Sequence, residues 1–457
     1  MANNRSNFTG KIGFVLAAAG SAVGLGNIWR FPYLAAKYGG GIFLLVYIVL
    51  SVTFGFTLLC AEIAIGRKTG QSPMGAFAQL GKKYTVVGWL ASMIPMLILP
   101  YYSVIGGWVT KYIAVFVSGG VANASQSGYF SDFITSPIEP LAWFFLFIGL
   151  TALIVLFGVE KGIEKVSKIM MPILIVMIVG IAVYGMFMPG AMEGVKYYIL
   201  PDFSKFNYMT VVAAMGQLFY SMSIAMGIMI TYGSYMKKEI SIESSVKQIE
   251  VFDTSVAFLA GLMVIPAVFA FGSEADLANA GPTLMFITLP KVFNAMPAGG
   301  VIGAVFFIMV FFAALSSSIS LMETVVSVIQ DKTKMKRPAI CLTVFIGALI
   351  LGVPSSLGFG ILDFISVGGQ TILDLFDFVS NSLLMPIVAF LTSIIVGYAI
   401  KPKTIIDEIK LSGKFKNEKL FVIIIKYVAP IFTLLILLSS ILDFVCGKIL
   451  QLEQFII

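Results

Sequence analysis

Two hydrophobic stretches of the chain are interrupted by small and polar residues that could bind a solute. The first reads AAAGSAVGLGNIWRFP over residues 17–32, with Gly20, Gly24 and Gly26 in its middle. The second reads GQLFYSMSIAMGIMITYGSY over residues 216–235 and contains several serines. Because glycine lowers helix propensity by about 1 kcal/mol relative to alanine, the first stretch in particular is expected to break as a helix. A broken helix exposes backbone N–H and C=O groups that can bind a ligand.

The composition shows what kind of element must position these stretches. Hydrophobic residues make up 59% of the 457 residues and charged residues only 12%, whereas charged residues reach about 25% in soluble domains. The chain is therefore predicted to be an integral membrane protein, and its many phenylalanines and glycines favour packed helices over a β-barrel. It contains no histidine and three well-separated cysteines, which excludes His-dependent catalysis and suggests no redox or zinc role.

Eleven apolar runs are long enough to span a bilayer, which takes about 20 residues each. They lie near residues 12–36, 41–66, 86–117, 140–158, 165–188, 207–236, 244–272, 299–330, 338–353, 370–400 and 420–445. The amino terminus lacks a signal-peptide cleavage site and runs directly into the first span. Most lysines and arginines fall on one side if the amino terminus is cytoplasmic, which predicts an extracellular carboxyl terminus. This bias explains the net charge of +7 without a nucleic-acid partner.

The interrupted spans are the first and the sixth, which occupy corresponding positions in two five-helix halves. An odd-numbered half must be inverted relative to the next, and paired interruptions in inverted halves indicate the central site of a secondary transporter. The predicted fold is an all-α polytopic membrane protein with 11 transmembrane helices and a 5+5 inverted repeat in which helices 1 and 6 are broken. The expected divisions are a cytoplasmic segment 1–10, repeats 11–200 and 201–400, and a loop, last helix and short tail over 401–457.

The stretch from Gly20 to Pro32 resembles the first-helix signature of the neurotransmitter:sodium symporter family. Further resemblance lies in GGGIFLLVY, AEIAIGR, PYY, GQLFYSMSIAMG, FFAALSSSISLME and LFDF. The similarity covers residues 5–400 and is strongest to the bacterial eleven-helix branch that carries tyrosine or other hydrophobic amino acids. The resemblance implies transport by the leucine transporter fold and the site residues that follow.

An amino acid substrate brings a carboxylate and an ammonium into the membrane, and each needs a partner. By resemblance, the N–H groups of Leu25 and Gly26 and the Tyr102 hydroxyl bind the carboxylate, while carbonyls and the Ser223 hydroxyl accept from the ammonium. Gly24 stands where monoamine transporters carry an acid, so the substrate must supply its own carboxylate. The implied substrate-binding residues are Ala22, Gly24, Leu25, Gly26, Ile98, Tyr102, Tyr220, Ser221, Ser223, Met226, Ser317 and Leu321.

Two sodium sites are implied by the resemblance. The first would use Ala22, Asn27, Ser221, Asp253 and the substrate carboxylate. The second would use the carbonyls of Gly20, Val23 and Ala313 with the hydroxyls of Ser316 and Ser317. The family usually has asparagine at Asp253, and chloride-dependent relatives have serine at Ala257, so chloride-independent transport is expected. The alternative for Asp253 is membership of an internal salt bridge.

Charged residues within spans are costly and therefore functional candidates. The resemblance assigns Arg30 and Asp377 to an outer gate, with Gln217 holding Arg30 and the rings of Tyr102 and Tyr220 forming a lid. The assigned inner-gate residues are Arg5, Asp331, Tyr235 and Phe8, although the two aromatics could instead be interfacial. Gly162 and Pro172 have a spacing that resembles the branch's hinge in the fifth span.

The resulting prediction is a bacterial cell-membrane symporter that imports a hydrophobic or aromatic amino acid with Na⁺ by alternating access. Tyrosine is the preferred substrate, with leucine, phenylalanine and tryptophan as alternatives. A channel or a non-transporting amino-acid sensor could share the fold, whereas an enzyme would need a catalytic constellation that the sequence lacks. Glu62 is interpreted as a structural acid, with proton carriage as the alternative, and Glu323, Asp374 and Asp443 receive no role. The predicted partners are the amino acid substrate and membrane lipid, with no nucleic acid, and the sequence does not give the oligomeric state.

Overall fold

The computed structural model describes residues 7–271, 282–442 and 444–445. Within these residues every long element is helical, and extended backbone occurs only as two isolated bridges, Gly40 with Pro201 and Val367 with Gln370. This agrees with the predicted all-α class. An apolar chain in lipid must satisfy its backbone hydrogen bonds within each segment, and a helix does so.

Nine of the described helical segments are long and apolar enough to cross a membrane. Four are single helices: Glu139–Leu156 (α9), Ile242–Phe271 (α14), Gly299–Lys332 (α17) and Arg337–Leu357 (α18). Two end in a long helix: Lys82–Val117 in α6 (Thr85–Val117) and Val159–Met186 in α10 (Lys165–Met186). Three contain two helices: Gly41–Thr69 with α3 (Gly41–Leu50) and α4 (Phe56–Thr69), Ile372–Ala399 with α19 (Ile372–Asp377) and α20 (Met385–Ile394), and Glu418–Leu442 with α22 (Glu418–Ile423) and α23 (Ala429–Leu442). Several contain a π-helical turn between their α-helical parts. Their positions agree closely with nine of the eleven predicted spans.

The two remaining predicted spans are the interrupted ones. Helix α1 (Lys11–Ala22) and the segment Gly26–Lys37, which ends in α2 (Phe31–Lys37), form a pair bent by 54°. Helix α12 (Tyr208–Ser221) and helix α13 (Ile228–Ser234) are likewise separated by a short irregular linker. With the bent pair counted once, the described residues contain ten candidate spans. The total of eleven, the two repeats and the orientation remain predictions.

Short helices connect the spans. They are α5 (Pro73–Leu80), α7 (Val121–Ala124), α8 (Tyr129–Thr135), α11 (Ala191–Ile199), α16 (Leu289–Ala295) and α21 (Pro402–Lys410). Asp443, to which no role was assigned, lies outside the described residues, as does Arg5.

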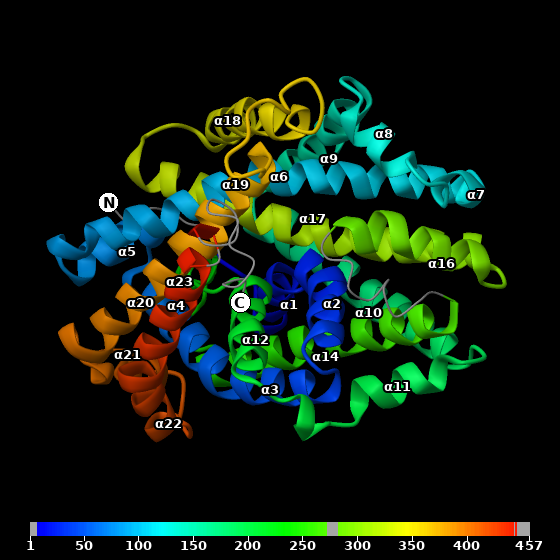
Figure 1. Ribbon diagram of the computed structural model, residues 1–457. Coiled ribbons are helices and arrows are strands. Elements are labelled where there is room, and N and C mark those ends of the chain that lie inside the picture. The colour runs from blue at the N-terminus through cyan, green and yellow to red at the C-terminus, as the bar shows by residue number, and fades with distance from the viewer. Residues whose placement is uncertain (1–6, 272–281, 443, 446–457) are drawn as a thin grey trace.

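The broken helices lie in the middle of the molecule. Figure 1 shows α1, α2 and α12 at the centre, with α6 and α17 along one side and α14 and α3 along the other. The backbones of α13 and α4 lie in close contact. A β-carbon on Gly66 would overlap the Ile230 carbonyl, and one on Gly233 would overlap the Ile63 carbonyl. Glycine allows membrane helices to approach this closely. The surrounding spans thus hold both breaks inside a protein environment.

Candidate solute-binding site

The backbone leaves the helical path at both breaks. Helix α1 ends at Ala22, and Val23 is extended with φ −72° and ψ 99°. In the second linker Ser223 and Ala225 adopt left-handed backbone with φ 53° and 64°, and Gly227 follows with φ 71°. Left-handed backbone in residues other than glycine is strained and persists only where the surroundings hold it. Both breaks therefore free backbone groups at the centre of the protein.

Serine hydroxyls connect the two breaks to each other and to α17. Ser223 Oγ donates to the Ser21 carbonyl at 3.0 Å. From α17, Ser317 Oγ lies 3.1 Å from the Ser21 carbonyl, 3.4 Å from that of Val23 and 3.5 Å from that of Gly20. These hydroxyls supply some of the partners that the carbonyls lose where the helix ends.

Glu62 holds the second linker from α4. Its Oε1 accepts a hydrogen bond from the Ala225 N–H at 2.7 Å, and the residue is 2% exposed. The other oxygen has no hydrogen-bond partner among the described residues. This geometry agrees with the interpretation of Glu62 as a structural acid that binds broken-helix backbone.

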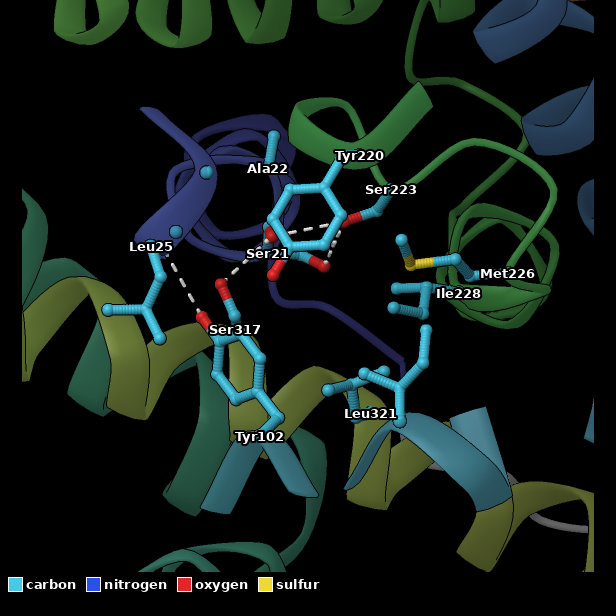
Figure 2. A pocket seen from close by; sticks show the side chains of 13 residues that line it. Ser21, Ala22, Leu25, Tyr102, Tyr220, Ser223, Met226, Ile228, Ser317 and Leu321 are labelled. Carbon is cyan, nitrogen blue, oxygen red and sulfur yellow. Dashed lines mark hydrogen bonds between the residues drawn. The ribbon is translucent and has the colours of Figure 1, made fainter. Parts of the chain in front are cut away.

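A cavity lies between the two breaks, α6 and α17 (Figure 2). Its lining consists of Ser21, Ala22, Gly24, Leu25, Gly26, Ile98, Tyr102, Tyr220, Ser223, Met226, Ile228, Ser317 and Leu321. Of the residues predicted to bind substrate, the cavity brings together all but Ser221. The sequence analysis missed Ser21 and Ile228, although both flank residues of the recognised motifs.

The polar end of the cavity lies beside the first break. The Leu25 N–H donates to the Tyr102 hydroxyl at 3.3 Å, so two groups predicted to bind a carboxylate point to one place. A β-carbon on Gly24 would lie 2.8 Å from Ser317 Oγ and 3.1 Å from the Tyr102 hydroxyl. A β-carbon on Gly26 would overlap the Tyr220 ring. The absence of side chains at the two glycines therefore lets Ser317, Tyr102 and Tyr220 approach the first break closely.

Four of the residues around the first predicted sodium site form one buried hydrogen-bond network. Asn27 Nδ2 donates to Asp253 Oδ1 at 2.8 Å, and Ser221 Oγ donates to Oδ2 at 3.3 Å. Tyr47, which the sequence analysis missed, donates to Asp253 Oδ2 at 2.9 Å and lies 2.8 Å from Ser221 Oγ. Ser221 thus belongs to this network and does not line the cavity.

The second predicted sodium site contains only neutral oxygens. Ser317 contacts the carbonyls of Gly20 and Val23, and Ser316 Oγ donates to the Ala313 carbonyl at 3.0 Å. The Ser317 contacts join the first break to α17, whereas the bond between Ser316 and Ala313 lies within α17. The two sets adjoin, because a β-carbon on Gly20 would lie 3.3 Å from Ser316 Cβ. Within the described residues no group of three or more histidine, cysteine or acidic side chains could hold a metal ion. Both oxygen sets suit a hard monovalent cation, which unwound backbone carbonyls commonly coordinate.

Arg30 and Asp377, the residues of the predicted outer gate, each contact residues other than one another. The Arg30 guanidinium lies 5.2 Å from the centre of the Tyr220 ring. Asp377 accepts from the Tyr101 hydroxyl at 2.9 Å and from Asn381 Nδ2 at 2.5 Å. In the part of the chain that the structure describes, Arg30 and Asp377 form no direct ion pair.

Gln217 has a different partner from the predicted one. It donates through Nε2 to the Gly26 carbonyl at 2.9 Å, and its Oε1 has no hydrogen-bond partner among the described residues. It therefore supports the backbone of the first break, four residues before Arg30, and not the guanidinium itself.

Asp331 and Tyr235 of the predicted inner gate form polar contacts with several other residues. Asp331 accepts from the Ser72 N–H at 2.8 Å and from Ser72 Oγ at 2.6 Å. Glu323, to which the sequence analysis gave no role, is fully buried, pairs with Arg337 and accepts from the Tyr235 hydroxyl at 2.8 Å. Tyr235 therefore takes part in a network that includes the ion pair between Glu323 and Arg337.

Phe8 and Thr9, near the start of the described residues, pack against other parts of the protein. The Phe8 side chain is fully buried and makes edge contacts with the rings of Phe14, Tyr232 and Tyr235 at 5.6–6.2 Å. Phe8 therefore fills a buried position and is not an interfacial aromatic in this structure. Thr9 binds the Glu164 carboxylate through its N–H and its hydroxyl.

Gly162 and Glu164 lie in the π-helical turn Val159–Glu164, before the helix α10 (Lys165–Met186) that contains Pro172. A β-carbon on Gly162 would overlap the Ile154 carbonyl. The irregular turn at Gly162 is compatible with the predicted hinge. Asp374, also without a predicted role, caps α19 through a reciprocal bond with Thr371.

Two interrupted helices around a buried cavity, with adjoining sets of oxygen atoms, define the class of sodium-coupled secondary transporters. The profile of the sodium:neurotransmitter symporter family matches residues 5–125 and 134–456. The chain therefore belongs to this family, and the resemblance found in the sequence is confirmed. It is a sodium symporter of the membrane and not an enzyme.

Individual relatives agree with this assignment. The chain is 35% identical to an uncharacterised sodium-dependent transporter, YhdH, of Bacillus subtilis over 94% of the chain and 96% of that protein. It is 26% identical to the sodium- and chloride-dependent GABA transporter 2 of Rattus norvegicus, over 96% of the chain and 79% of that protein. Among solved structures, MhsT in complex with L-phenylalanine matches with a TM-score of 0.87 and 36% identity, covering 96% of the chain and 100% of MhsT.

Proposed function

We propose that this protein imports a hydrophobic or aromatic L-amino acid together with Na⁺. In this proposal Na⁺ binds at two sites, and transport does not require chloride. The observation that carries the proposal is the cavity between the two breaks, where the Leu25 N–H and the Tyr102 hydroxyl converge 3.3 Å apart. A carboxylate placed there could accept from both groups. The solved relative MhsT contains L-phenylalanine, which supports an amino acid as the solute.

The rest of the cavity supports a large apolar side chain. Met226, Ile228 and Leu321 lie away from the polar end (Figure 2), and Ile98 also lines the cavity. A methionine can move aside and contact an aromatic ring favourably. Tyrosine is the proposed preferred substrate, and a broad preference for leucine, phenylalanine and tryptophan is the alternative. One methylene discriminates by only about 1–3 kcal/mol in such a pocket, so competition by all amino acids must decide.

The Asp253 network supports chloride independence. Asn27, Tyr47 and Ser221 all donate to this one carboxylate, which is fully buried. A negative charge is thus covalently attached beside the first sodium site, and a chloride ion there would be repelled at short range. Ala257, one turn further along α14, offers no hydroxyl to an anion.

Transport follows from alternating exposure of this central site. We propose that the amino terminus is cytoplasmic, so that Arg30 and Asp377 lie on the outer side and Asp331, Tyr235 and Arg5 on the inner side. Solute and Na⁺ enter from outside, the outer side closes, and the inner contacts then open. Inward movement of one Na⁺ through 100 mV contributes about 2.3 kcal/mol.

The test is binding and uptake with the purified full chain. Binding of radiolabelled L-tyrosine should require Na⁺, and unlabelled hydrophobic amino acids should compete. In proteoliposomes, uptake should collapse without a Na⁺ gradient and persist when gluconate replaces chloride. A strict chloride requirement would refute the role given to Asp253, while sodium-dependent binding without concentrative uptake would favour a sensor.

A further inference from the structure

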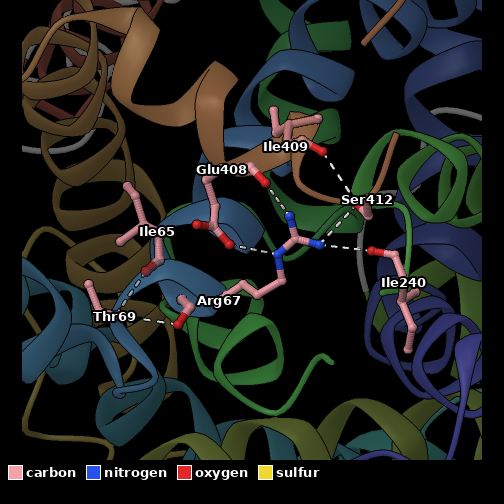
Figure 3. Close-up of polar contacts among 8 residues, drawn as sticks. Ile65, Arg67, Thr69, Ile240, Glu408, Ile409 and Ser412 are labelled. Atoms are coloured by element: carbon pink, nitrogen blue, oxygen red, sulfur yellow. Dashed lines mark hydrogen bonds and ion pairs between the residues drawn. The ribbon is translucent and has the colours of Figure 1, made fainter. Parts of the chain in front are cut away.

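Helix α4 (Phe56–Thr69) carries a buried arginine near its inner end that the proposed function does not use. Arg67 is 4% exposed. Its Nε donates to Glu408 Oε1 at 2.9 Å, and its Nη2 donates to the Glu408 carbonyl. Its Nη1 donates to the Ile240 carbonyl at 2.8 Å and to Ser412 Oγ at 3.2 Å (Figure 3). One guanidinium therefore connects three stretches that are far apart in the sequence.

Two of these stretches belong to different parts of the structure. Ile240 lies in the turn that follows α13, the inner half of the second broken helix. Glu408 and Ser412 lie in residues 401–417, which contain α21 and which we call the clasp. Pro402, Ile405, Ile406 and Ile409 bury the apolar side of α21 against the rest of the protein.

The clasp has a second attachment that does not involve Arg67. The Lys416 N–H donates to Glu243 Oε2 at 2.9 Å, in the first turn of α14. The Phe415 ring stacks on Phe56 of α4, with ring centres 6.4 Å apart. The clasp is therefore docked on α4 and α14 even before the arginine is considered, so loss of Arg67 should loosen it without detaching it.

The chemistry of Arg67 explains why this contact is specific. A guanidinium presents several donors in a fixed fork, whereas a lysine ammonium is a compact point charge. Lysine at this place could keep the charge but could not reach Glu408, Ile240 and Ser412 together. By contrast, the ion pair between Lys410 and Glu418 next to it is 44% and 42% exposed and should contribute little.

We propose that Arg67 is a positioning residue for transport, which makes α13 move together with α4 and the clasp. Helix α13 already lies at backbone distance from α4 through Gly66 and Gly233, and Arg67 fixes the chain where it leaves α13. When Na⁺ binds between the two breaks, α13, α4 and the clasp then move together and close the inner side. The inference rests on the proposed function, because it concerns sodium-driven closure, and it adds a residue outside the central site.

The first test compares the sodium dependence of amino acid binding in the full chain and its variants. We expect Arg67→Lys to raise the Na⁺ concentration for half-maximal binding about 3- to 10-fold, because a smaller fraction of the protein would be closed at rest. The amount bound at saturating Na⁺ should stay the same, and Lys410→Gln should match the parent protein. Reduced binding capacity with unchanged sodium dependence would indicate a merely structural role and overturn the proposal.

The second test measures distances and does not depend on the solute. Spin labels at the exposed positions Lys238 and Asp407 report whether the turn after α13 and the clasp move together. We expect one narrow distance distribution with and without Na⁺, and a broad one in Arg67→Lys. A distance that changes with Na⁺ in the parent protein, or stays narrow in the variant, would overturn the proposal. If no amino acid binds to the parent protein, the proposed function fails while this measurement still decides on the clasp.

Discussion

The two breaks free backbone groups in different ways. At the first break, Gly24 and Gly26 do not have positive φ, and glycine is needed there for space beside Tyr102, Ser317 and Tyr220. At the second break, Ser223 and Ala225 adopt the left-handed conformation that glycine would favour. At the first break, therefore, glycine leaves room for the side chains that pack against the backbone. The second break is a strained linker that neighbouring residues hold in place.

The largest effect should come from filling the space at the first break. Gly26→Ala places a methyl group in the Tyr220 ring, and such overpacking costs up to about 3 kcal/mol. We expect amino acid affinity to fall about 100-fold in equilibrium binding. Gly216→Ala is the control, because a β-carbon there meets nothing within 4 Å. Normal amino acid affinity in Gly26→Ala would show that binding at the first break does not depend on the close approach of the Tyr220 ring to Gly26.

The second break should depend on Glu62. Glu62→Leu removes the acceptor of the buried Ala225 N–H, and an unsatisfied buried group costs about 1–3 kcal/mol. Glu62→Gln keeps an acceptor oxygen and should cost clearly less. Thermal unfolding in detergent with both variants separates the two expectations. Equal losses would mean that the negative charge, and not the hydrogen bond, holds the linker.

Asp253 joins the two breaks, since it accepts from Asn27 of the first and Ser221 of the second. We expect Asp253→Asn to raise the Na⁺ requirement about 10-fold, which corresponds to about 1.4 kcal/mol. The measurement is the sodium dependence of amino acid binding. In the double variant with Ala257→Ser, chloride should partly restore sodium affinity. If sodium affinity is also restored when gluconate replaces chloride, the restoration does not come from chloride binding.

The smallest expected effect concerns strain in the second linker. Ala225→Gly relieves a left-handed alanine, a conformation that costs about 1–2 kcal/mol in residues other than glycine. Because glycine also loses more entropy on folding, we expect a stabilisation of about 0.5 kcal/mol in thermal unfolding. Ala213→Gly, inside α12, should instead destabilise by about 1 kcal/mol. Similar losses in both variants would show that Ala225 is not strained.

Much of the central site could be predicted from the sequence, because its residues lie in two short motifs and on α6 and α17. The cavity includes Gly24, Tyr102 and Ser317 among other predicted residues. The partners of buried charges could not be predicted. Tyr47 contacts Asp253 across 206 residues of sequence and Arg67 contacts Glu408 across 341. In a membrane helix almost every face is apolar, so periodicity does not show which way such side chains point.

The sequence alone determined that the chain is a helical membrane protein and where its first helix breaks, because hydrophobic length and the clustering of glycines act locally along the chain. It also indicated the second interruption, but not its left-handed backbone. Only the tertiary structure decided how that linker is held, which acids are paired and how the clasp docks. These features depend on contacts between distant segments, whose hydrogen bonds form only once the helices have packed.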